Sequence, residues 1–223
     1  MTVSKSSALL MKKISERYYN DSKELVKSTI ENKHSLSIFL NSKFPGYLKN
    51  IDHVLKAYNQ MAPTPISCSA GCDACCYTYV GISSVEAVYM IHNLNKNYST
   101  DQLIRIHKAI AERQLFQNIL KRKESCLSEQ VKSYFEKKIP CQFLIDHQCS
   151  IYEFRPVACR NLCVVTPNEW CSHSDMYSKI KIFRHPSVYK IDIMVQKFLS
   201  DYYLKLRDYD IMQSQLLRFW NVI

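Results

Sequence analysis

Glycine and long apolar runs are both scarce in this chain of 223 residues. Only three residues are glycine, and neither G-x-G-x-x-G nor G-x-x-x-x-G-K-[ST], the patterns of loops that cradle phosphate groups, occurs. The N-terminal apolar run, Ala8–Met11, is too short for a signal peptide. The longest run elsewhere, Ala87–Ile91, has five residues against the ~20 that cross a bilayer. These absences predict a soluble, cytoplasmic protein with no membrane span and no glycine-rich nucleotide site.

The scarcity of turn residues favours helices. Three glycines and seven prolines suit long helices better than a many-turned β-sandwich, and an apolar content of 47% is enough for a core. Leu48, Ile51 and Leu55 recur at helical spacing, and Pro45-Gly46 predicts a turn between helices just before them. Only one short pair of strands is expected, around Phe143 and Ile151. The sequence therefore predicts an all-α protein.

Two central helices have recognisable starts. Ser83 and Glu86 have the S-x-x-E spacing of a capping box, in which both side chains satisfy free backbone N–H groups at a helix start. We interpret Glu86 as this cap, with a catalytic carboxylate as the alternative. Thr100 is expected to cap the next helix, whose inward-facing residues include Leu115 and Ile119 on a drifting face.

The chain divides into three parts that we expect to form one compact unit. Residues 1–60 predict an N-terminal helical extension, residues 61–178 hold all the cysteines, and residues 179–223 predict C-terminal helices packing on the core through Val188 and Ile191. The net charge of +10 divides among these parts as +5, +1 and +4. Because the positive charge avoids the cysteines and no basic recognition helix follows them, nucleic-acid binding is not expected.

Ten cysteines are the most informative feature. In a reducing compartment they are metal ligands or reactive thiols rather than a disulfide framework. Four of them, Cys68, Cys72, Cys75 and Cys76, fall within nine residues. A compact loop of thiolates can surround a soft or borderline metal, whereas cysteines that only fill a core have no reason to cluster. Side chains of adjacent residues on an extended backbone point apart, so Cys75 and Cys76 are expected to serve different sites or to bridge them.

A second cysteine region follows in residues 140–171, which show no regular periodicity. Together with the first region, its Cys141, Cys149, Cys159 and Cys171 give eight thiols, enough for two four-coordinate sites or for one cluster plus one ion. We therefore expect irregular, cysteine-rich loops clamped by metal, with both regions closing over a shared centre. Three alternatives stay open for Cys163: a packed side chain that binds no metal, an alternative ligand, or a free thiol.

Other residues near the cysteines have simpler explanations. Cys126 stands alone at the start of a predicted helix of residues 127–138, and a lone helix cysteine is more often packed than ligating. Asp146, His147 and His173 lie close to cysteines, but loop histidines are more often solvated than bound to metal.

Two arginines flank Cys159 in sequence. A metal held by four thiolates carries negative charge that needs donors or cations nearby. Arg155 and Arg160 are therefore predicted to surround the centre without ligating it, by hydrogen bonds to sulfurs or to loop carbonyls.

The order of these motifs resembles a known family. C-x3-C-x2-C-C, followed by Cys141, by Cys149-x-Ile151-Tyr152 with Arg155-Pro156, and by Cys159-Arg160, is similar to the YkgJ-like cysteine-cluster family of zinc- or iron-chelating proteins. The likeness covers roughly residues 66–175. It implies metal binding, and one distantly related branch is linked to lysine N-methylation of flagellin, with S-adenosylmethionine as the methyl donor. We can locate no cofactor pocket for that donor in the sequence.

The sequence leaves two functional readings and the identity of the metal open. Zinc and an iron–sulfur cluster both accept four-cysteine sets, and the paired cysteines with a thiol surplus lean toward iron. One reading is a metal-dependent enzyme that modifies a protein substrate, as in lysine methylation, or carries out redox chemistry. The other is a non-catalytic protein whose centre is structural or handles metal, and whose helices bind a partner.

Overall fold

The protein is mostly helical, which confirms the all-α prediction at the level of fold class. The computed structural model describes residues 5–69, 71–123, 126–199, 201 and 209–220. In this part of the chain the strands are two or three residues long and form only two-stranded antiparallel pairs. None of the described helices is both long and apolar enough to pass through a bilayer.

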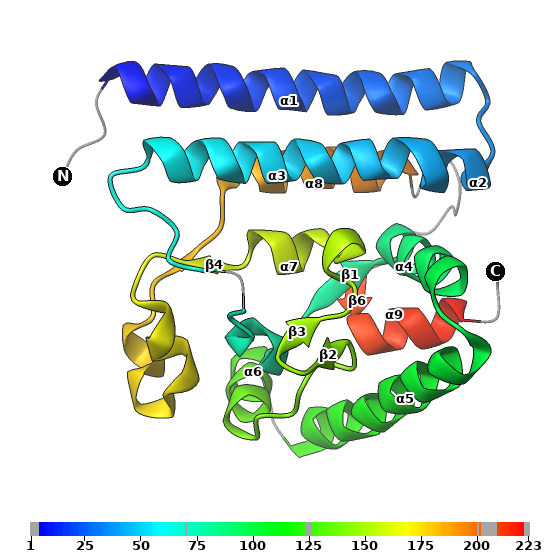
Figure 1. The fold of residues 1–223 in the computed structure, drawn as a ribbon, viewed down its shortest axis with the longest axis vertical. Coiled ribbons are helices and arrows are strands. Elements are labelled where there is room, and N and C mark those ends of the chain that lie inside the picture. Colours follow the sequence, from blue (N-terminus) through cyan, green and yellow to red (C-terminus); the bar gives the residue numbers. More distant parts are fainter. Residues whose placement is uncertain (1–4, 70, 124–125, 200, 202–208, 221–223) are drawn as a thin grey trace.

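One layer of the molecule is made of three long helices. Helix α1 (Lys5–Glu31) packs on α3 (Phe44–Met61), and α8 (Pro186–Leu199) packs on both. Figure 1 shows α1 and α3 side by side, with α8 behind α3. The short helix α2 (Leu36–Ile38) and the π-helical turn η1 (Phe39–Lys43) connect α1 to α3.

The turn predicted at Pro45-Gly46 is wrong, because both residues lie in the first turn of α3. Proline is tolerated there, since the first N–H groups of a helix have no intrahelical acceptor. A Cβ on Gly46 would come 3.3 Å from Leu25 Cδ1 of α1. The glycine therefore serves the close approach of two helices instead of a reversal of the chain.

A second group of helices packs around α4 (Ser84–Asn97). Strand β1 (Gly81–Ser83) leads into it and pairs with β6 (Tyr209–Ile211), in the register Gly81 to Ile211. Helix α9 (Met212–Phe219) follows β6 and packs on α4 and on α5 (Thr100–Lys123), and α6 (Leu127–Glu136) packs on α5. The C-terminal helices thus contact both groups.

The capping box at the start of α4 is confirmed. Ser83 Oγ accepts the Glu86 main-chain N–H at 3.2 Å, and a Glu86 carboxylate oxygen accepts the Ser83 main-chain N–H at 2.9 Å. The cap predicted for α5 at Thr100 is wrong by one residue. Ser99 Oγ accepts the Gln102 main-chain N–H at 3.4 Å, and Thr100 already belongs to the helix.

The inward face of α5 differs from the prediction in its second half. Leu115 and Ile119 are 65% and 48% exposed, whereas Arg113, Gln117 and Leu120 are buried. The apolar spacing continues along the sequence, but the helix turns its other face to α6 and α9. Apolar periodicity could not reveal this, because the buried face carries a cation and an amide.

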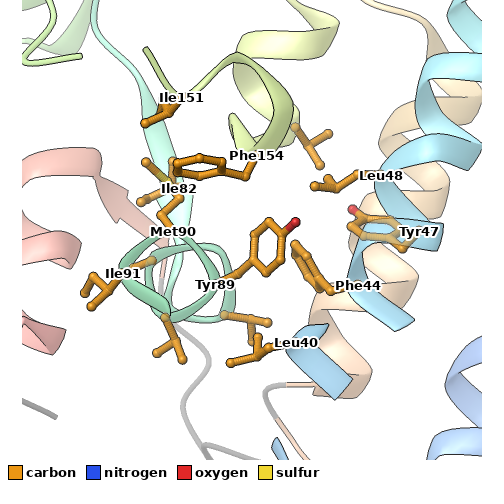
Figure 2. Packing of buried hydrophobic residues seen from close by; sticks show 14 of the residues in the cluster. Leu40, Phe44, Tyr47, Leu48, Ile82, Tyr89, Met90, Ile91, Ile151 and Phe154 are labelled. Carbon is orange, nitrogen blue, oxygen red and sulfur yellow. The ribbon is translucent and has the colours of Figure 1, made fainter. Parts of the chain in front are cut away.

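The core lies between the two groups of helices. Phe44 of α3 meets Tyr89 of α4 with ring centroids 4.5 Å apart, and Ile82, Ile151 and Phe154 close the cluster from the side of the cysteine segments (Figure 2). The cluster also includes the predicted Val188 and Ile191 of α8. The same buried cluster therefore contains residues from all three predicted parts of the chain.

Short elements carry the cysteines. The first region contains η2 (Ala74–Tyr77), a 3₁₀ turn. The second contains the hairpin of β2 (Leu144–Ile145) and β3 (Gln148–Cys149), then η3 (Tyr152–Phe154), α7 (Val157–Asn161), β4 (Cys163–Val164), η4 (Asn168–Ser172), η5 (Ser174–Lys179) and β5 (Ile182–Phe183), which pairs with β4. The strand pair expected around Phe143 and Ile151 is this hairpin.

Candidate metal centre

Backbone hydrogen bonds bring the two cysteine regions together. Ser67 N donates to Val164 O at 2.9 Å, which ties the start of the first region to β4. At the other end of that region, Cys141 N donates to Cys76 O at 2.7 Å. Figure 1 shows the teal segment that contains η2 beside α6 and the hairpin. The expected approach of residues 68–76 to residues 141–171 is thus observed in the backbone.

A side-chain contact adds to this connection. His147 Nδ1 lies 2.7 Å from an Asp73 carboxylate oxygen. Asp146 and His147 both have positive φ, 48° and 61°, as the two central residues of a type I′ hairpin turn do. His147 therefore links the hairpin to the first cysteine region through Asp73 and not through a thiol. His173 is exposed at the end of η4.

The argument that kept Cys75 and Cys76 apart is wrong. It assumed an extended backbone, but both residues lie in the 3₁₀ turn η2, where neighbouring side chains come closer together. The Cys76 thiol donates a hydrogen bond to the Cys75 sulfur, which lowers the pKa of Cys75 and raises the pKa of Cys76. The adjacent pair thus contributes two sulfurs to the same neighbourhood.

Five thiols form one group, which we name the inner cysteines: Cys75, Cys76, Cys141, Cys149 and Cys159. Burial is the largest cause that raises the pKa of Cys159 well above its ordinary value, and Cys141, Cys75 and Cys149 raise that pKa further. Burial also raises the pKa of Cys141 to about 11. These thiols are therefore close enough for negative charge on one to oppose negative charge on the others.

Four thiols form a second group, which we name the outer cysteines: Cys68, Cys72, Cys163 and Cys171. A hydrogen bond from Cys163 is the largest cause that lowers the pKa of Cys68 to about 6, and the Val164 N–H, 3.3 Å from the Cys68 sulfur, lowers it further. Burial raises the pKa of Cys171 to about 11, and Cys72 and Cys68 add to that rise. The charge of Cys68 opposes the lowering of the Cys75 pKa, and Cys75 in turn raises the pKa of Cys171, so Cys75 is within electrostatic range of both groups.

Cys163 belongs with the outer cysteines, although the sequence left its role open. It is buried, and its thiol is within reach of two acceptors, the Cys68 sulfur and the Arg160 carbonyl at 3.5 Å. Its single S–H proton can serve one of them at a time. The only sequence signal was its place four residues after Cys159 and inside the cysteine-rich stretch. Cys126, by contrast, is exposed at the N-cap of α6.

Arg155 lies among the thiols of both groups. Its positive charge lowers the pKa of inner and outer cysteines alike, namely Cys68, Cys75, Cys149, Cys159 and Cys163. The guanidinium carbon lies 4.0 Å from the centre of the Tyr152 ring, and Nη2 donates to the Tyr152 hydroxyl at 3.3 Å. The Nε of Arg155 is buried and has no hydrogen-bond partner among the residues that the structure describes. A positive charge with an unused donor is therefore available to an anionic centre.

Arg160 has a different task from Arg155. Its Nη1 donates to an Asp52 carboxylate oxygen at 2.5 Å, and its Nε and Nη2 donate to the carbonyls of Arg155 and Glu153 at 3.0 and 2.6 Å. Of the two predicted roles, the hydrogen bonds to loop carbonyls are the ones observed. Arg160 thus fixes the loop that presents Arg155 and Cys159, and anchors it to α3.

An open hollow borders Cys72, one of the outer cysteines. Its volume is about 370 Å³, and its lining is polar and includes Cys72, Asp73, Asn168 and Glu169. Through it a molecule from solvent can reach Cys72. The inner cysteine Cys141, which precedes the hairpin, does not line it.

The thiols meet as pairs and not as a finished coordination shell. Within the described residues, no three His, Cys, Asp or Glu side chains stand in an arrangement that could hold a metal ion as they are. All ten cysteines lie in the described part of the chain, and none of them forms a disulfide. The donor chemistry fits zinc or an iron–sulfur cluster, since both take thiolate sets, and the unpartnered Arg155 Nε fits the negative charge of either. Ligation would require rotations of the cysteine side chains.

Comparisons with known proteins do not extend these observations. No family model, curated protein or solved structure matches the chain. The YkgJ-like resemblance therefore stays a prediction carried by the motifs themselves.

Proposed function

We propose that this protein binds metal through its cysteines, in the form of zinc ions or of an iron–sulfur cluster. The observation that carries the proposal is that Arg155 lies within electrostatic range of five thiols from both segments: Cys68, Cys75, Cys149, Cys159 and Cys163. Burial, and next the repulsion between neighbouring thiolates, raises the pKa of Cys141, Cys159 and Cys171, so these thiols resist losing their protons. A metal cation removes that repulsion by taking the place of the protons, so metal binding is coupled to folding of both segments.

The two groups would have different parts in this function. The inner cysteines, which lie between η2, the hairpin and α7, would hold a centre that fastens those elements together. The outer cysteines, including Cys163 in addition to the predicted Cys68, Cys72 and Cys171, would hold a more accessible one beside the hollow. Free thiols in this number suit a reducing cytoplasm, and the YkgJ-like resemblance would account for the order of the motifs.

Metal content is the direct test. The protein is purified anaerobically, and its zinc, iron and acid-labile sulfide are measured alongside its visible spectrum. Brown protein with sulfide supports the iron–sulfur cluster, towards which the paired cysteines lean. Colourless protein with zinc supports the ion and removes the redox reading. Protein that takes up neither metal under anaerobic, reducing conditions overturns the proposal.

Cys163 and Cys126 offer a matched pair of variants for the same measurement. We expect Cys163→Ser to lose the metal of the outer cysteines while the inner centre stays loaded, because serine is a poor ligand for soft metals. Cys126→Ser changes an exposed thiol at the start of α6 and is expected to leave the metal content as it is. Equal metal content in both variants would remove Cys163 from the site.

A second candidate function is favoured by the hollow beside Cys72. A metal-dependent enzyme that modifies a protein substrate, or a redox enzyme, needs a path from solvent to its centre, and a structural centre does not. In the lysine-methylation form of this proposal the methyl donor is S-adenosylmethionine. Titration calorimetry on the metal-loaded protein tests that form, and the absence of binding would leave the redox form or a structural or metal-handling protein whose helices bind a partner.

A further inference from the structure

A network of hydrogen bonds with two carboxyl groups joins the two groups of helices. Glu86 of α4 is 1% exposed, and Asp192 of α8 is half-buried. The Ser83 hydroxyl oxygen lies 3.0 Å from Glu86 Oε2 and 2.6 Å from Gln196 Oε1 of α8. Gln196 Nε2 donates to Asp192 Oδ1 at 3.2 Å, and the Tyr47 hydroxyl of α3 donates to the same oxygen at 2.5 Å. We name these five residues the carboxyl network.

The carboxyl network has one hydrogen too few if both carboxyl groups are ionised. The Ser83 hydroxyl carries a single hydrogen, yet its oxygen lies within hydrogen-bond distance of two other side-chain oxygens. The main-chain N–H groups of Ser83 and Glu86 are already used in the capping box. At 2.6 Å, the hydrogen belongs between Ser83 and Gln196. The contact between Ser83 and Glu86 therefore needs a proton on the Glu86 carboxyl group.

The count of hydrogens is the same if the Gln196 amide is turned over. The oxygen and nitrogen of an amide have nearly the same size, so both orientations fit the space. In the turned orientation Nε2 donates to Ser83, the Ser83 hydrogen goes to Glu86, and Oε1 faces Asp192 Oδ1. That contact between two oxygens needs a proton on Asp192. In either orientation, one proton on one of the two carboxyl groups completes the network.

Among the described residues, no cation pairs with either carboxyl group. The residues that α1 buries are uncharged, namely Ser22, Val26 and Thr29. On α8 and on the elements that pack against α4 or β1, the described charged and titratable side chains outside the network are exposed or bound to other partners: Lys190, Lys197, Tyr152, Glu153, Arg160 and Arg218. Tyr47 is the third titratable group of the network, and burial raises its pKa well above the ordinary value, so it keeps its proton.

We propose that Glu86 and Asp192 share one proton, and that this proton holds α8 against the start of α4. When the proton passes to water at higher pH, the Ser83 hydrogen goes to the Glu86 carboxylate, because a charged acceptor binds it more strongly. Gln196 then loses its donor, and two negative charges remain in the network. Burial is the first cause that raises the pKa of both carboxyl groups, in agreement with a retained proton. This pH-sensitive contact needs no metal and is independent of the proposed function.

Infrared spectroscopy detects the proton directly, because a protonated carboxyl group has a C=O band that a carboxylate lacks. Exposed carboxyl groups are ionised at pH 6. We expect folded wild-type protein to show the band of one carboxyl group at pH 6 and to lose it as the pH rises to 9. Glu86→Gln should lack the band, because the glutamine amide supplies the missing hydrogen. Glu112→Gln, at an exposed position of α5, should keep it. A wild-type protein without the band, or a band that persists in Glu86→Gln, would overturn the inference.

A double-mutant cycle separates one shared proton from two independent ones. The slope of unfolding free energy against pH gives the number of protons that the protein takes up on folding. Between pH 6 and pH 8 we expect Glu86→Gln and Asp192→Asn each to remove an uptake of about one proton, since each amide supplies the hydrogen that the network lacks. The double variant should remove no more than either single variant. Losses that add would show two independent groups and overturn the sharing.

Tyr47→Phe serves if the carboxyl variants do not fold. It removes one donor to Asp192 and keeps the ring in the core. Because Asp192 then holds negative charge less well, the shared proton should be retained and the infrared band should disappear at a higher pH than in wild type. Tyr189→Phe, which changes an exposed tyrosine of the same helix as Asp192, is the control. A folded Tyr47→Phe that loses the band at the wild-type pH would overturn the sharing.

Hydrogen exchange tests the effect on the helices. After correction for the intrinsic effect of pH on exchange, we expect the amide groups of α8 to be less protected in wild type at pH 8 than at pH 6. In Glu86→Gln their protection should be the same at both pH values. Equal protection of α8 in wild type at both pH values, with the band lost between them, would overturn the role of the proton in holding α8.

Discussion

Glu86 is a single carboxylate that joins the hydrophobic core to the cysteine segment. It is buried at the start of α4, and besides capping that helix it accepts the Val157 main-chain N–H at 2.8 Å. Val157 begins α7, the helix that carries Cys159. The capping box predicted from the sequence is therefore also a fastening point for α7, which a pattern of four residues could not reveal.

The same carboxylate makes stability depend on pH. Burial, and next the charge of Asp192, raise the pKa of Glu86 from 4.5 to about 7. The folded protein then holds the proton more tightly than the unfolded chain, so the stability that it confers is present below pH 4.5 and lost as pH rises through 7. The loss is on the order of 3 kcal/mol.

The prediction for Glu86→Gln follows from this loss of stability with rising pH. Glutamine cannot ionise, so we expect a constant cost from its altered hydrogen bonds and a stability that falls less steeply than wild type between pH 5 and 8. Urea unfolding across this range measures the difference. Glu112→Gln, at an exposed position of α5, is the control. Parallel pH curves for wild type and Glu86→Gln would contradict the prediction.

The spacing of the cysteines predicted the thiols of the candidate site better than it predicted the residues that surround them. The eight cysteines chosen from their spacing all belong to the two groups, and Arg155 lies among them. The role of Cys163 stayed open in the sequence, because it fits no spacing rule and its place beside Cys68 depends on the fold around β4, which pairs with β5.

At the scale of an element, α7 is held by Arg160. This arginine donates to Asp52 of α3 and to two carbonyls of the preceding loop, and its own side chain is only 4% exposed. Three hydrogen bonds from one guanidinium replace the long hydrophobic face that a five-residue helix lacks. The position of Cys159 therefore depends on Arg160. Among the described residues, Arg160 makes no hydrogen bond to the Cys159 sulfur.

Replacement of Arg160 should consequently weaken the whole protein. We expect Arg160→Met to lower the free energy of unfolding by about 3 kcal/mol, at the low end for a buried ion pair because Asp52 is partly exposed. Urea unfolding measures the loss, with Arg105→Met at an exposed site as the control. A loss below about 1 kcal/mol, the value of a surface pair, would show that the loop carbonyls and α7 do not depend on Arg160.

At the scale of the whole molecule, helix content followed from composition, but the arrangement did not. Scarce glycine and helical spacing predicted the class, and the stripe with Val188 and Ile191 identified a core face of α8. Helix α8 packs on α1 and α3, whereas α9 packs on α4 and α5. Both arrangements depend on contacts between segments that are distant in sequence. Spacing within a helix carries no information about its partner helix.

Removal of the proposed metal is expected to affect the molecule unevenly. Structural zinc sites contribute on the order of 10–16 kcal/mol of folding free energy, so a chelator should release residues 68–76 and 141–171 first. The layer of α1, α3 and α8 has its own buried contacts, such as Val26, Ile51 and Val195, and should persist. Hydrogen exchange with and without chelator measures this. Uniform loss of protection, or none in the cysteine segments, would contradict the expectation.

The separation of the two cysteine regions along the chain has a consequence during synthesis. Residues 68–76 leave the ribosome before Cys141, whose main-chain N–H donates to the Cys76 carbonyl, has been translated. Under the proposed metal binding, the early thiols either remain reduced and without metal until the later cysteines are made, or bind an ion that afterwards exchanges some of its ligands. In a cell starved of metal, the nascent chain would expose these sulfurs to oxidants at the moment when they have no partners.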